Sequence, residues 1–286
     1  GRLLGRERVN LGALVRSELG FVLEKGHGAA DWSVRPLPAN QLRYAVLDVE
    51  FLVELRNALH SALIEDGKWD WAQQEFTALL GFRPRERGDD AWRKTSGIHS
   101  VRKARNLAVV RELWRERDRV ATKSDIATGR ILPDTAIVAA AVALPKNVDE
   151  LSALPPYSGR GQQRRRATWW GAIERAYALP DADLPAITVP PTGPPPPRAW
   201  ADRNPAAFAR LEAAKSIVSE ISEVRGLPTE NIVNPELLRR LCWEPPAEIT
   251  NASITAALVE AGAREWQSGL LAELLTAAWT SDGADS

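Results

Sequence analysis

The chain has 286 residues, of which 44% are hydrophobic and 26% are charged, a composition typical of soluble globular proteins. It contains no apolar run long enough to span a membrane and no signal-peptide pattern, so we expect a cytoplasmic protein without membrane contact. The single cysteine, Cys242, excludes an internal disulfide framework. Basic and acidic side chains balance at 37 each, which excludes a protein that is basic or acidic throughout.

The neutral total conceals an uneven distribution of charge. Residues 102–180 hold 15 basic and 8 acidic side chains, whereas residues 203–286 hold 7 and 12. A basic segment beside an acidic one indicates a local anionic partner for the middle of the chain. The chain also has no methionine and no start-like segment, so we expect it to be part of a longer protein.

Apolar residues at helical spacing predict the first elements. We expect helices over residues 11–19, 39–64 and 69–80, with a loop at 31–38. The long helix follows Pro36-Leu37-Pro38, and its apolar face comprises Leu42, Val46, Val49, Val53 and Leu59. No convincing strand is present in residues 1–85, so this segment reads as the tail of an α/β domain without its sheet.

Two helical bundles of similar order follow, which indicates an internal duplication. In the first, helices are expected over about 101–123, after Pro133, over 148–154 and over 161–179. In the second, they are expected over about 204–224, after Pro235, after Thr250 and over 265–279. The proline-dense segment between the bundles is expected to be an extended, semi-rigid spacer.

The segment from Asp31 to Asp48 carries the most informative motif. It reads Asp31-Trp32-Ser33-Val34-Arg35-Pro36-Leu37, then Leu42, Tyr44, Ala45, Asp48 and Val49. Tyr44 and Asp48 are four residues apart in the predicted helix, so they project from one side, one turn apart. A carboxylate and a phenol placed in this way can hold a metal ion and a water molecule together. The spacing alone is common in surface helices, so the interpretation depends on the surrounding motif.

This motif closely resembles the third exonuclease motif of the ribonuclease D family, which belongs to the tyrosine-bearing DEDD exonucleases. The bundles resemble HRDC domains, and ribonuclease D has a nuclease domain followed by two of them. The expected fold class is therefore mainly α. Residues 1–85 would be the helical tail of a truncated α/β exonuclease domain, 86–180 and 203–286 two HRDC-like helical bundles, and 181–202 the Pro-rich linker.

The resemblance implies a 3′-5′ exoribonuclease with two divalent cations, Mg²⁺ or Mn²⁺, held by four carboxylates from three motifs. It implies that Asp48 is a metal ligand and that Tyr44 orients the attacking water. The family's first motif, an Asp-x-Glu on a strand, and its second, a further Asp, are not found before Asp31. Asp48-Val49-Glu50 has the first motif's form in a helical setting, which argues against that identity. We therefore expect this chain alone to lack the metal pair and nuclease activity.

A run of arginines, followed by Trp169-Trp170, begins the last helix of the first bundle. We expect nucleic-acid phosphates to contact these arginines and two basic residues at the start of the long helix. The expected contacts are Arg160, Arg164, Arg165, Arg166, Lys103 and Arg105, and Arg111, Arg115 and Arg119 extend this surface along the helix. The alternative interpretations are a solvated charged face and a core tryptophan pair.

Other sites find little support in the sequence. His27, His60 and His99 are dispersed without zinc-ligand spacing. Gly159-Arg160-Gly161 lacks the third glycine of a dinucleotide-binding loop. Cys242 lies between apolar neighbours and is best explained as a buried small residue.

The sequence thus predicts the C-terminal part of a ribonuclease D-like exoribonuclease, monomeric, whose bundles bind RNA with a single-stranded 3′ end, such as tRNA precursors. The alternative is a non-catalytic HRDC module that contacts nucleic acid or protein, with the acidic second bundle docking onto a protein surface.

Overall fold

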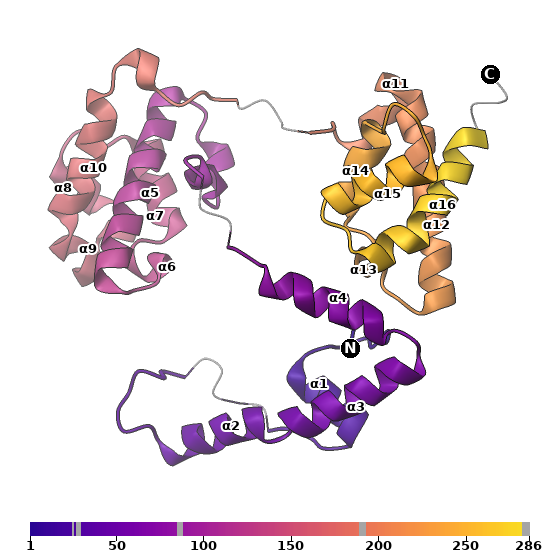
Figure 1. Cartoon of the computed structure of the whole chain (residues 1–286). Helices are drawn as coiled ribbons and strands as arrows, with labels where there is room; N and C mark the ends of the chain where they lie inside the picture. The colour runs from indigo at the N-terminus through magenta and orange to yellow at the C-terminus, as the bar shows by residue number, and fades with distance from the viewer. Residues whose placement is uncertain (25, 27–29, 85–87, 189–192, 282–286) are drawn as a thin grey trace. The chain divides into compact units, whose positions relative to one another are not determined.

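The computed structural model describes residues 1–24, 26, 30–84, 88–188 and 193–281, except for the side chain of Ser281. All regular secondary structure in these residues is helical, which confirms the mainly α prediction. The chain divides into two compact units (Figure 1): residues 84–190 form one, and residues 1–83 together with 191–286 form the other. None of the described helices is both long enough and apolar enough to cross a membrane.

The described residues of the N-terminal segment form four helices (Figure 1): α1 (Leu11–Leu19), α2 (Ala39–Glu50), α3 (Leu52–Glu65) and α4 (Trp69–Leu80). The Asn10 side chain starts α1 by accepting a hydrogen bond from the Ala13 N–H, and Gly20 ends it in the left-handed conformation. A small core of Leu14, Val15 and Leu55 joins α1 to α3.

The helix expected over residues 39–64 is two helices, which corrects the prediction. The chain leaves helical geometry at Phe51, where φ is −97° and ψ is 5°. The Phe51 ring stacks on Phe21 with centroids 4.9 Å apart and packs against the α1–α3 core. A tertiary contact between distant residues therefore accompanies the break, and such a contact leaves no trace in local periodicity.

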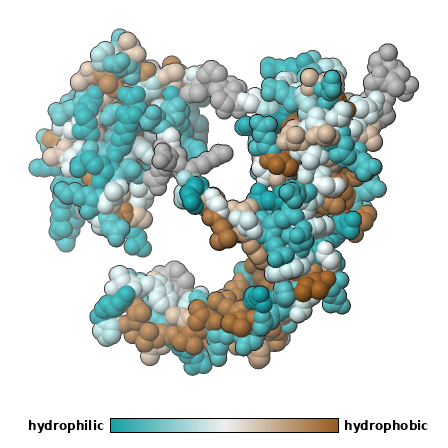
Figure 2. Space-filling model, in the orientation of Figure 1, coloured by the Kyte–Doolittle hydropathy of each residue, from teal (hydrophilic) through white to brown (hydrophobic). Residues whose placement is uncertain are grey.

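The apolar face predicted for this helix is largely exposed. Leu42, Val46, Val49 and Val53 are each at least 50% exposed. Figure 2 shows the corresponding brown surface along α2 and α3. Of the large hydrophobic residues exposed among the described residues, 14 of 21 lie before residue 84. The N-terminal segment therefore holds two thirds of the exposed large apolar side chains among the described residues.

The first bundle lies in residues 84–190. Its helices are α5 (Ala104–Ser124), α6 (Thr128–Ile131), α7 (Asp134–Ala143), α8 (Val148–Ala153), α9 (Arg160–Arg164) and α10 (Arg166–Ala178), with 3₁₀ turns at Ala91–Lys94, Ile98–Ser100, Pro155–Tyr157 and Asp181–Asp183. Trp92, Tyr157 and Trp169 are fully buried in its core. The helix expected over 161–179 is broken at Arg165, so the arginine run spans the junction of α9 and α10.

The second bundle lies in residues 193–281. Its helices are α11 (Trp200–Arg203), α12 (Pro205–Arg225), α13 (Thr229–Ile232), α14 (Pro235–Trp243), α15 (Asn251–Glu260) and α16 (Glu265–Ser281), preceded by a 3₁₀ turn at Pro197–Ala199. The expected extended spacer is packed at its C-terminal end: Trp200 is fully buried, and its indole N–H donates to the Pro195 carbonyl at 2.7 Å. Residues 189–192 of that spacer lie outside the described residues.

The two bundles repeat one arrangement. A 21-residue helix ends in a left-handed residue, Asp125 in the first and Gly226 in the second. A four-residue helix follows in each, and its last residue is Ile131 or Ile232, both buried and 101 residues apart. The helical order supports the predicted duplication at the level of structure.

The second bundle packs on α4 within one unit. Lys68, at the start of α4, is buried and donates to the Arg225 carbonyl at 2.7 Å. Trp71 stacks on Trp266 with centroids 4.8 Å apart, and the Trp266 indole donates to Glu75 at 3.0 Å. These contacts join the N-terminal helices to the C-terminal bundle between residues that lie 157 to 195 positions apart in the sequence.

Candidate catalytic and nucleic-acid-binding residues

The loop before α2 folds back onto that helix. The Asp31 carboxylate accepts hydrogen bonds from the Ser33 N–H at 2.9 Å and the Ser33 hydroxyl at 2.6 Å. The Trp32 ring lies 6.1 Å from the Tyr44 ring, and the buried Gln41 amide donates to the Asp31 carbonyl at 3.5 Å. The two halves of the sequence motif therefore form one local structure.

Tyr44 and Asp48 occupy successive turns of α2, as predicted from their spacing, and both are half-buried. Among the described residues, no hydrogen-bond or ion-pair partner lies beside the Asp48 carboxylate. Its oxygens therefore have lone pairs available to a ligand, and Tyr44 stands one turn away to contact the same ligand.

The donors here do not fit a metal pair on their own. Among the described residues, no group of three or more His, Cys, Asp or Glu side chains lies close enough to hold a metal ion. Asp48 and Glu50 are two residues apart, so they project from different sides of α2. Two hard cations need several oxygen ligands, and one carboxylate does not supply them.

The histidines and the cysteine do not form a catalytic or metal-binding site among the described residues. The His60 ring meets Trp69 edge-on at 4.2 Å, His99 lies in a 3₁₀ turn, and His27 lies outside the described residues. Cys242 is fully buried, and burial raises the pKa of its thiol to about 12. It therefore stays protonated and unreactive at neutral pH.

The arginines of the α9–α10 junction are open to solvent. Arg160, Arg164 and Arg166 are exposed and Arg165 is half-buried. No described side chain forms an ion pair with any of the four. The neighbouring Trp169 is a core residue whose indole N–H donates to Gln162 at 2.8 Å. The junction thus presents four uncompensated positive charges.

The other two predicted contacts lie at the opposite end of α10. Lys103 is exposed at the start of α5. Arg105 donates to the carbonyls of Ala176, Tyr177 and Leu179 and pairs with Asp181 at 2.6 Å. Its guanidinium closes the C-terminal end of α10, where exposed carbonyls favour a cation. The six predicted residues therefore do not form one cluster.

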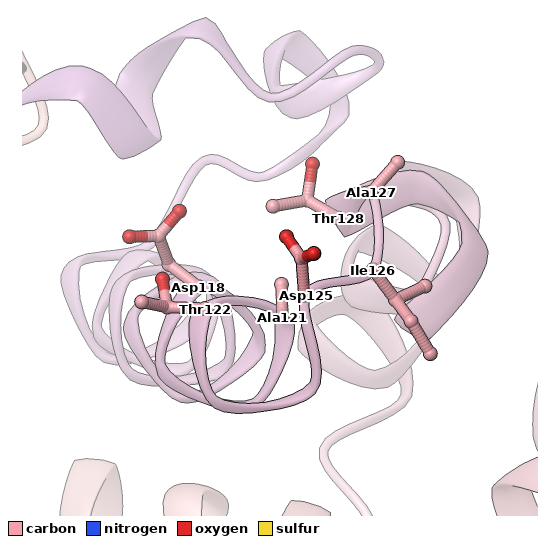
Figure 3. Close-up of a pocket in the computed structure, with 7 residues that line it drawn as sticks. All are labelled: Asp118, Ala121, Thr122, Asp125, Ile126, Ala127 and Thr128. Carbon is pink, nitrogen blue, oxygen red and sulfur yellow. The ribbon is translucent and has the colours of Figure 1, made fainter. Parts of the chain in front are cut away.

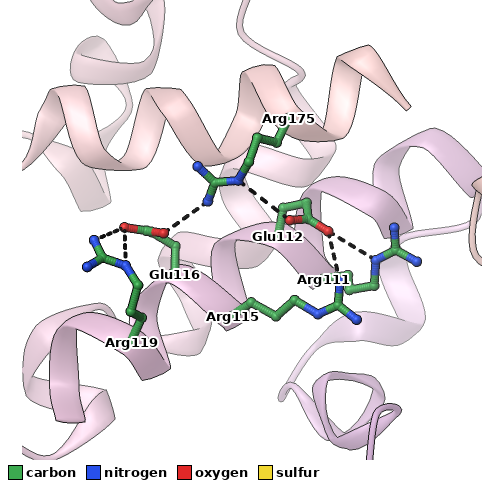
Figure 4. A network of polar contacts seen from close by, with 6 residues as sticks. All are labelled: Arg111, Glu112, Arg115, Glu116, Arg119 and Arg175. Atoms are coloured by element: carbon green, nitrogen blue, oxygen red, sulfur yellow. Dashed lines mark hydrogen bonds and ion pairs between the residues drawn. The ribbon is translucent and has the colours of Figure 1, made fainter. Parts of the chain in front are cut away.

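Arg111, Arg115 and Arg119, which were expected to extend this surface, lie between these two sets along the helix axes. They belong to a charged network whose carboxylates were not predicted from the sequence. Glu112 and Glu116 are buried on α5, and four arginines surround them (Figure 4): Arg111, Arg115, Arg119 and Arg175. The available signal was the Arg-Glu pair repeated after four residues, at 111–112 and 115–116, which places both glutamates on one side of the helix.

A pocket of about 580 Å³ opens at the C-terminal end of α5. Figure 3 shows its polar lining of Asp118, Thr122, Asp125 and Thr128. Two carboxylates and two hydroxyls make this pocket acidic, so it does not suit a phosphate.

Comparison with known families covers most of the chain in three segments. Residues 1–64 match the family model described as "3'-5' exonuclease", residues 106–173 the "HRDC domain", and residues 193–279 the "3' to 5' exonuclease C-terminal domain". The HRDC match covers the first bundle, while the second bundle matches a differently described model. The expectation of two HRDC domains is therefore wrong: the matches give one HRDC domain, although the second bundle repeats its helical order.

Similar proteins include ribonuclease D of Nitrobacter hamburgensis, 29% identical over 83% of this chain and 59% of that protein. Ribonuclease D of Acidiphilium cryptum is 31% identical over 63% of this chain and 46% of its own length. The chain thus spans about 59% of the length of the first of these relatives.

Two solved structures resemble the whole chain. A protein from Bifidobacterium adolescentis is 34% identical with a TM-score of 0.86, over 98% of this chain and 71% of that one. Escherichia coli RNase D, described as an exoribonuclease involved in structured RNA processing, has a TM-score of 0.63 over the same shares. At 23% identity, the second likeness establishes the fold alone.

Proposed function

We propose, from the premise that this chain is ribonuclease D-like and combines 3′-5′ exonuclease segments with an HRDC domain, that it acts in metal-dependent 3′-5′ exoribonucleolysis. In this proposal α2 contributes Asp48 as a metal ligand and Tyr44 as the group that orients the attacking water. The first bundle binds the RNA. The substrates are RNAs with single-stranded 3′ ends, such as tRNA precursors, and the protein acts as a monomer.

The observation that carries the catalytic part is the folded motif around α2. The loop at 31–37 closes on Tyr44 and Gln41, so the half-buried Asp48 carboxylate and the Tyr44 phenol are held one turn apart on one helix side. A phenol can accept a hydrogen bond from a water and donate one to it, which suits the positioning role.

We infer that Asp48 supplies one carboxylate to a site whose other ligands come from outside the described residues. When bound, the divalent cations would activate water and stabilise the leaving oxygen. By themselves, the residues present bind and orient rather than hydrolyse. The chain alone is therefore expected to retain RNA without trimming it, which also accommodates the alternative of a non-catalytic binding module.

The RNA-binding part rests on uncompensated charge. The four arginines of the α9–α10 junction have no ion-pair partner among the described residues, so binding an anion there breaks no internal pair. Phosphates bound by such side chains release counterions, and the affinity then falls as salt rises.

The first test is 3′-end trimming of a labelled single-stranded RNA in Mn²⁺ by this chain and its Asp48→Ala variant. We expect neither protein to trim the RNA while both retain it in a binding assay. Trimming that disappears in Asp48→Ala would show that the described residues do complete a metal site.

A chimera tests the role of Asp48 directly. The aligned residues of Nitrobacter ribonuclease D are replaced by this chain, so that the relative supplies the remaining residues. We expect the chimera to trim RNA, Asp48→Ala to abolish trimming, and Tyr44→Phe to slow it. Glu50→Ala, which removes a carboxylate from another side of α2, is the matched control and is expected to keep activity. Equal loss in Asp48→Ala and Glu50→Ala would contradict the assignment.

A further inference from the structure

The network between α5 and α10 has two buried glutamates at its centre and arginines around them (Figure 4). Glu112 accepts hydrogen bonds from Arg111 Nε at 3.2 Å and from Arg115 Nη1 at 3.3 Å. Glu116 accepts from Arg119 Nε at 3.1 Å and from Arg175 Nη2 at 2.9 Å. Arg175 Nε also lies 3.8 Å from Glu112, so this one arginine bridges the two carboxylates. We call the four arginines the arginine array.

Burial separates the two kinds of charge. The side chains of Glu112 and Glu116 are 12% and 9% exposed. Those of Arg115, Arg119 and Arg175 are 49%, 60% and 53% exposed, whereas that of Arg111 is 17% exposed. The two carboxylates therefore lie beneath the solvent-exposed guanidinium groups of Arg115, Arg119 and Arg175. Gly171, one turn before Arg175 on α10, adds no side chain beside that guanidinium.

The array carries more positive charge than the network needs. Four guanidiniums surround two carboxylates, which leaves a local charge of +2. Each guanidinium has five N–H donors in a planar fork, and the carboxylates occupy one or two on each. The remaining donors are available to a second anion.

Glu112 and Glu116 also restrict the arginine side chains before any ligand binds. A free arginine side chain loses rotamer entropy when it is fixed by a ligand. Here the carboxylates have already fixed part of that freedom, so an incoming anion has less to order. Arg111, Arg115 and Arg119 stand on successive turns of α5, roughly 6 Å apart along the axis. That regular row suits a chain of linked anions better than a single small ion.

We propose that the arginine array binds consecutive backbone phosphates of the RNA, with Glu112 and Glu116 as its positioning residues. This inference rests on the proposed RNA-binding function and adds a surface to it. Arg166 and Arg175 are two and a half helical turns apart, so they lie on opposite sides of α10. The array is therefore a different surface from the α9–α10 junction, and the two can be tested separately.

The test measures the affinity of the full chain for a fluorescent single-stranded RNA by anisotropy, over a series of salt concentrations. The first variant is Arg115→Ala with Arg119→Ala, two exposed members of the array. Two lost phosphate contacts lower the slope of log K against log salt by about 1.4 and weaken binding on the order of tenfold. The control, Arg198→Ala with Arg203→Ala, removes the same charge from the other unit and leaves the slope unchanged.

The second variant distinguishes positioning from net charge. Glu112→Gln with Glu116→Gln makes the protein more positive by two charges. If charge alone governed binding, this variant would bind RNA more tightly. We expect it to bind several-fold more weakly because its arginines are no longer held, with the fold checked by circular dichroism. Tighter binding by a folded Gln variant would overturn the positioning role.

The outcomes separate this inference from the function on which it rests. Unchanged RNA affinity in the array variants, with a loss in Arg160→Ala plus Arg164→Ala, would overturn the array and leave the RNA-binding function standing. An array that contacts an acidic protein instead would give the same unchanged RNA affinity. Failure of the unaltered chain to bind RNA would overturn both proposals.

Discussion

Gly5 and Gly226 bring two distant backbones into close approach. Gly5 has a φ of +67°, and a Cβ added to it would lie 2.4 Å from the Gly226 carbonyl oxygen. Gly226 itself ends α12 in the left-handed conformation, so the N-terminal residues pass over a helix end of the second bundle. Gly20 has a similar φ of +79° but no atom within 4 Å of its virtual Cβ.

Alanine substitutions at Gly5 and Gly20 distinguish the cost of backbone strain from the cost of a steric clash. Gly5→Ala and Gly20→Ala both place alanine in the left-handed region, at a cost of about 1–2 kcal/mol. Gly5→Ala must in addition displace a backbone carbonyl, so we expect it to lower the free energy of unfolding clearly more than Gly20→Ala. Urea denaturation of both variants measures the difference. Equal destabilisation would show that the approach of Gly5 to Gly226 is looser than described.

Glu116 predicts a pH dependence of stability. The hydrogen bond from Arg119 lowers the pKa of its carboxyl below the ordinary 4.5, against the opposing effect of burial. A carboxyl whose folded pKa is depressed contributes stability above its unfolded pKa and loses it as the pH falls through the folded value. The Glu116 contribution is therefore complete at neutral pH and declines below about pH 4.5.

Thermal unfolding of the chain and of Glu116→Gln from pH 7 to pH 3 tests this. The difference in melting temperature is expected to be largest at neutral pH and to shrink below pH 4.5. Glu174→Gln, which removes an exposed carboxylate of α10, is the control and is expected to show little difference at any pH. A Glu116→Gln difference that stays constant down to pH 3 would contradict the assigned interaction.

At the scale of elements, local signals located the helices that begin and end with recognisable residues. Helix α1 spans Leu11–Leu19 and α4 spans Trp69–Leu80, as apolar spacing and the following glycines indicate. Helices α6 and α13 have four residues each, which is too short for a periodic pattern, so they were not predicted from the sequence.

The breaks at Phe51 and Arg165 had a different origin. Both residues take non-helical angles inside segments with good helical spacing, and Phe51 packs with residues far away in sequence. At Phe51 a tertiary contact accompanies the break, and a single sequence does not reveal such a contact.

The candidate sites divide in the same way. The relative placement of Tyr44 and Asp48 could be predicted from their spacing because one helix carries both residues. The Glu112–Glu116 network could not be predicted, because Arg175 joins it from another helix and the burial of the carboxylates depends on how α10 packs. Arg105 was predicted to contact phosphate, whereas in the structure it binds carbonyls at the end of α10. Those carbonyls lie more than 70 residues away, so the sequence alone does not show this role.

At the scale of the whole chain, the contact between α4 and the second bundle joins its two ends. Lys68 is its buried polar member: its ammonium reaches the Arg225 carbonyl and Asp66, each at 2.7 Å. Lys215 pairs with Glu212 at the same 2.7 Å, but both side chains are more than half exposed. The two lysines therefore differ in burial rather than in bond length.

We expect Lys68→Ala to lower the free energy of unfolding by about 2 kcal/mol, because a buried, charge-assisted hydrogen bond is lost. Lys215→Ala is expected to change it by less than about 1 kcal/mol, as is usual for an exposed ion pair. Chemical denaturation followed by tryptophan fluorescence measures both, since Trp71 and Trp266 lie at the contact. Similar losses in the two variants would mean that Lys68 does not hold α4 to the second bundle.

The division of the chain has a consequence for how it responds to cutting. Residues 84–190 are attached at both ends to segments that belong to the same unit. One proteolytic nick before or after the first bundle would therefore not release it, because the other attachment remains covalent. The outer segments would also stay associated through the contacts of Lys68 and Trp71. Two attachments therefore tether the first bundle to the other unit, and a single nick leaves one of them intact.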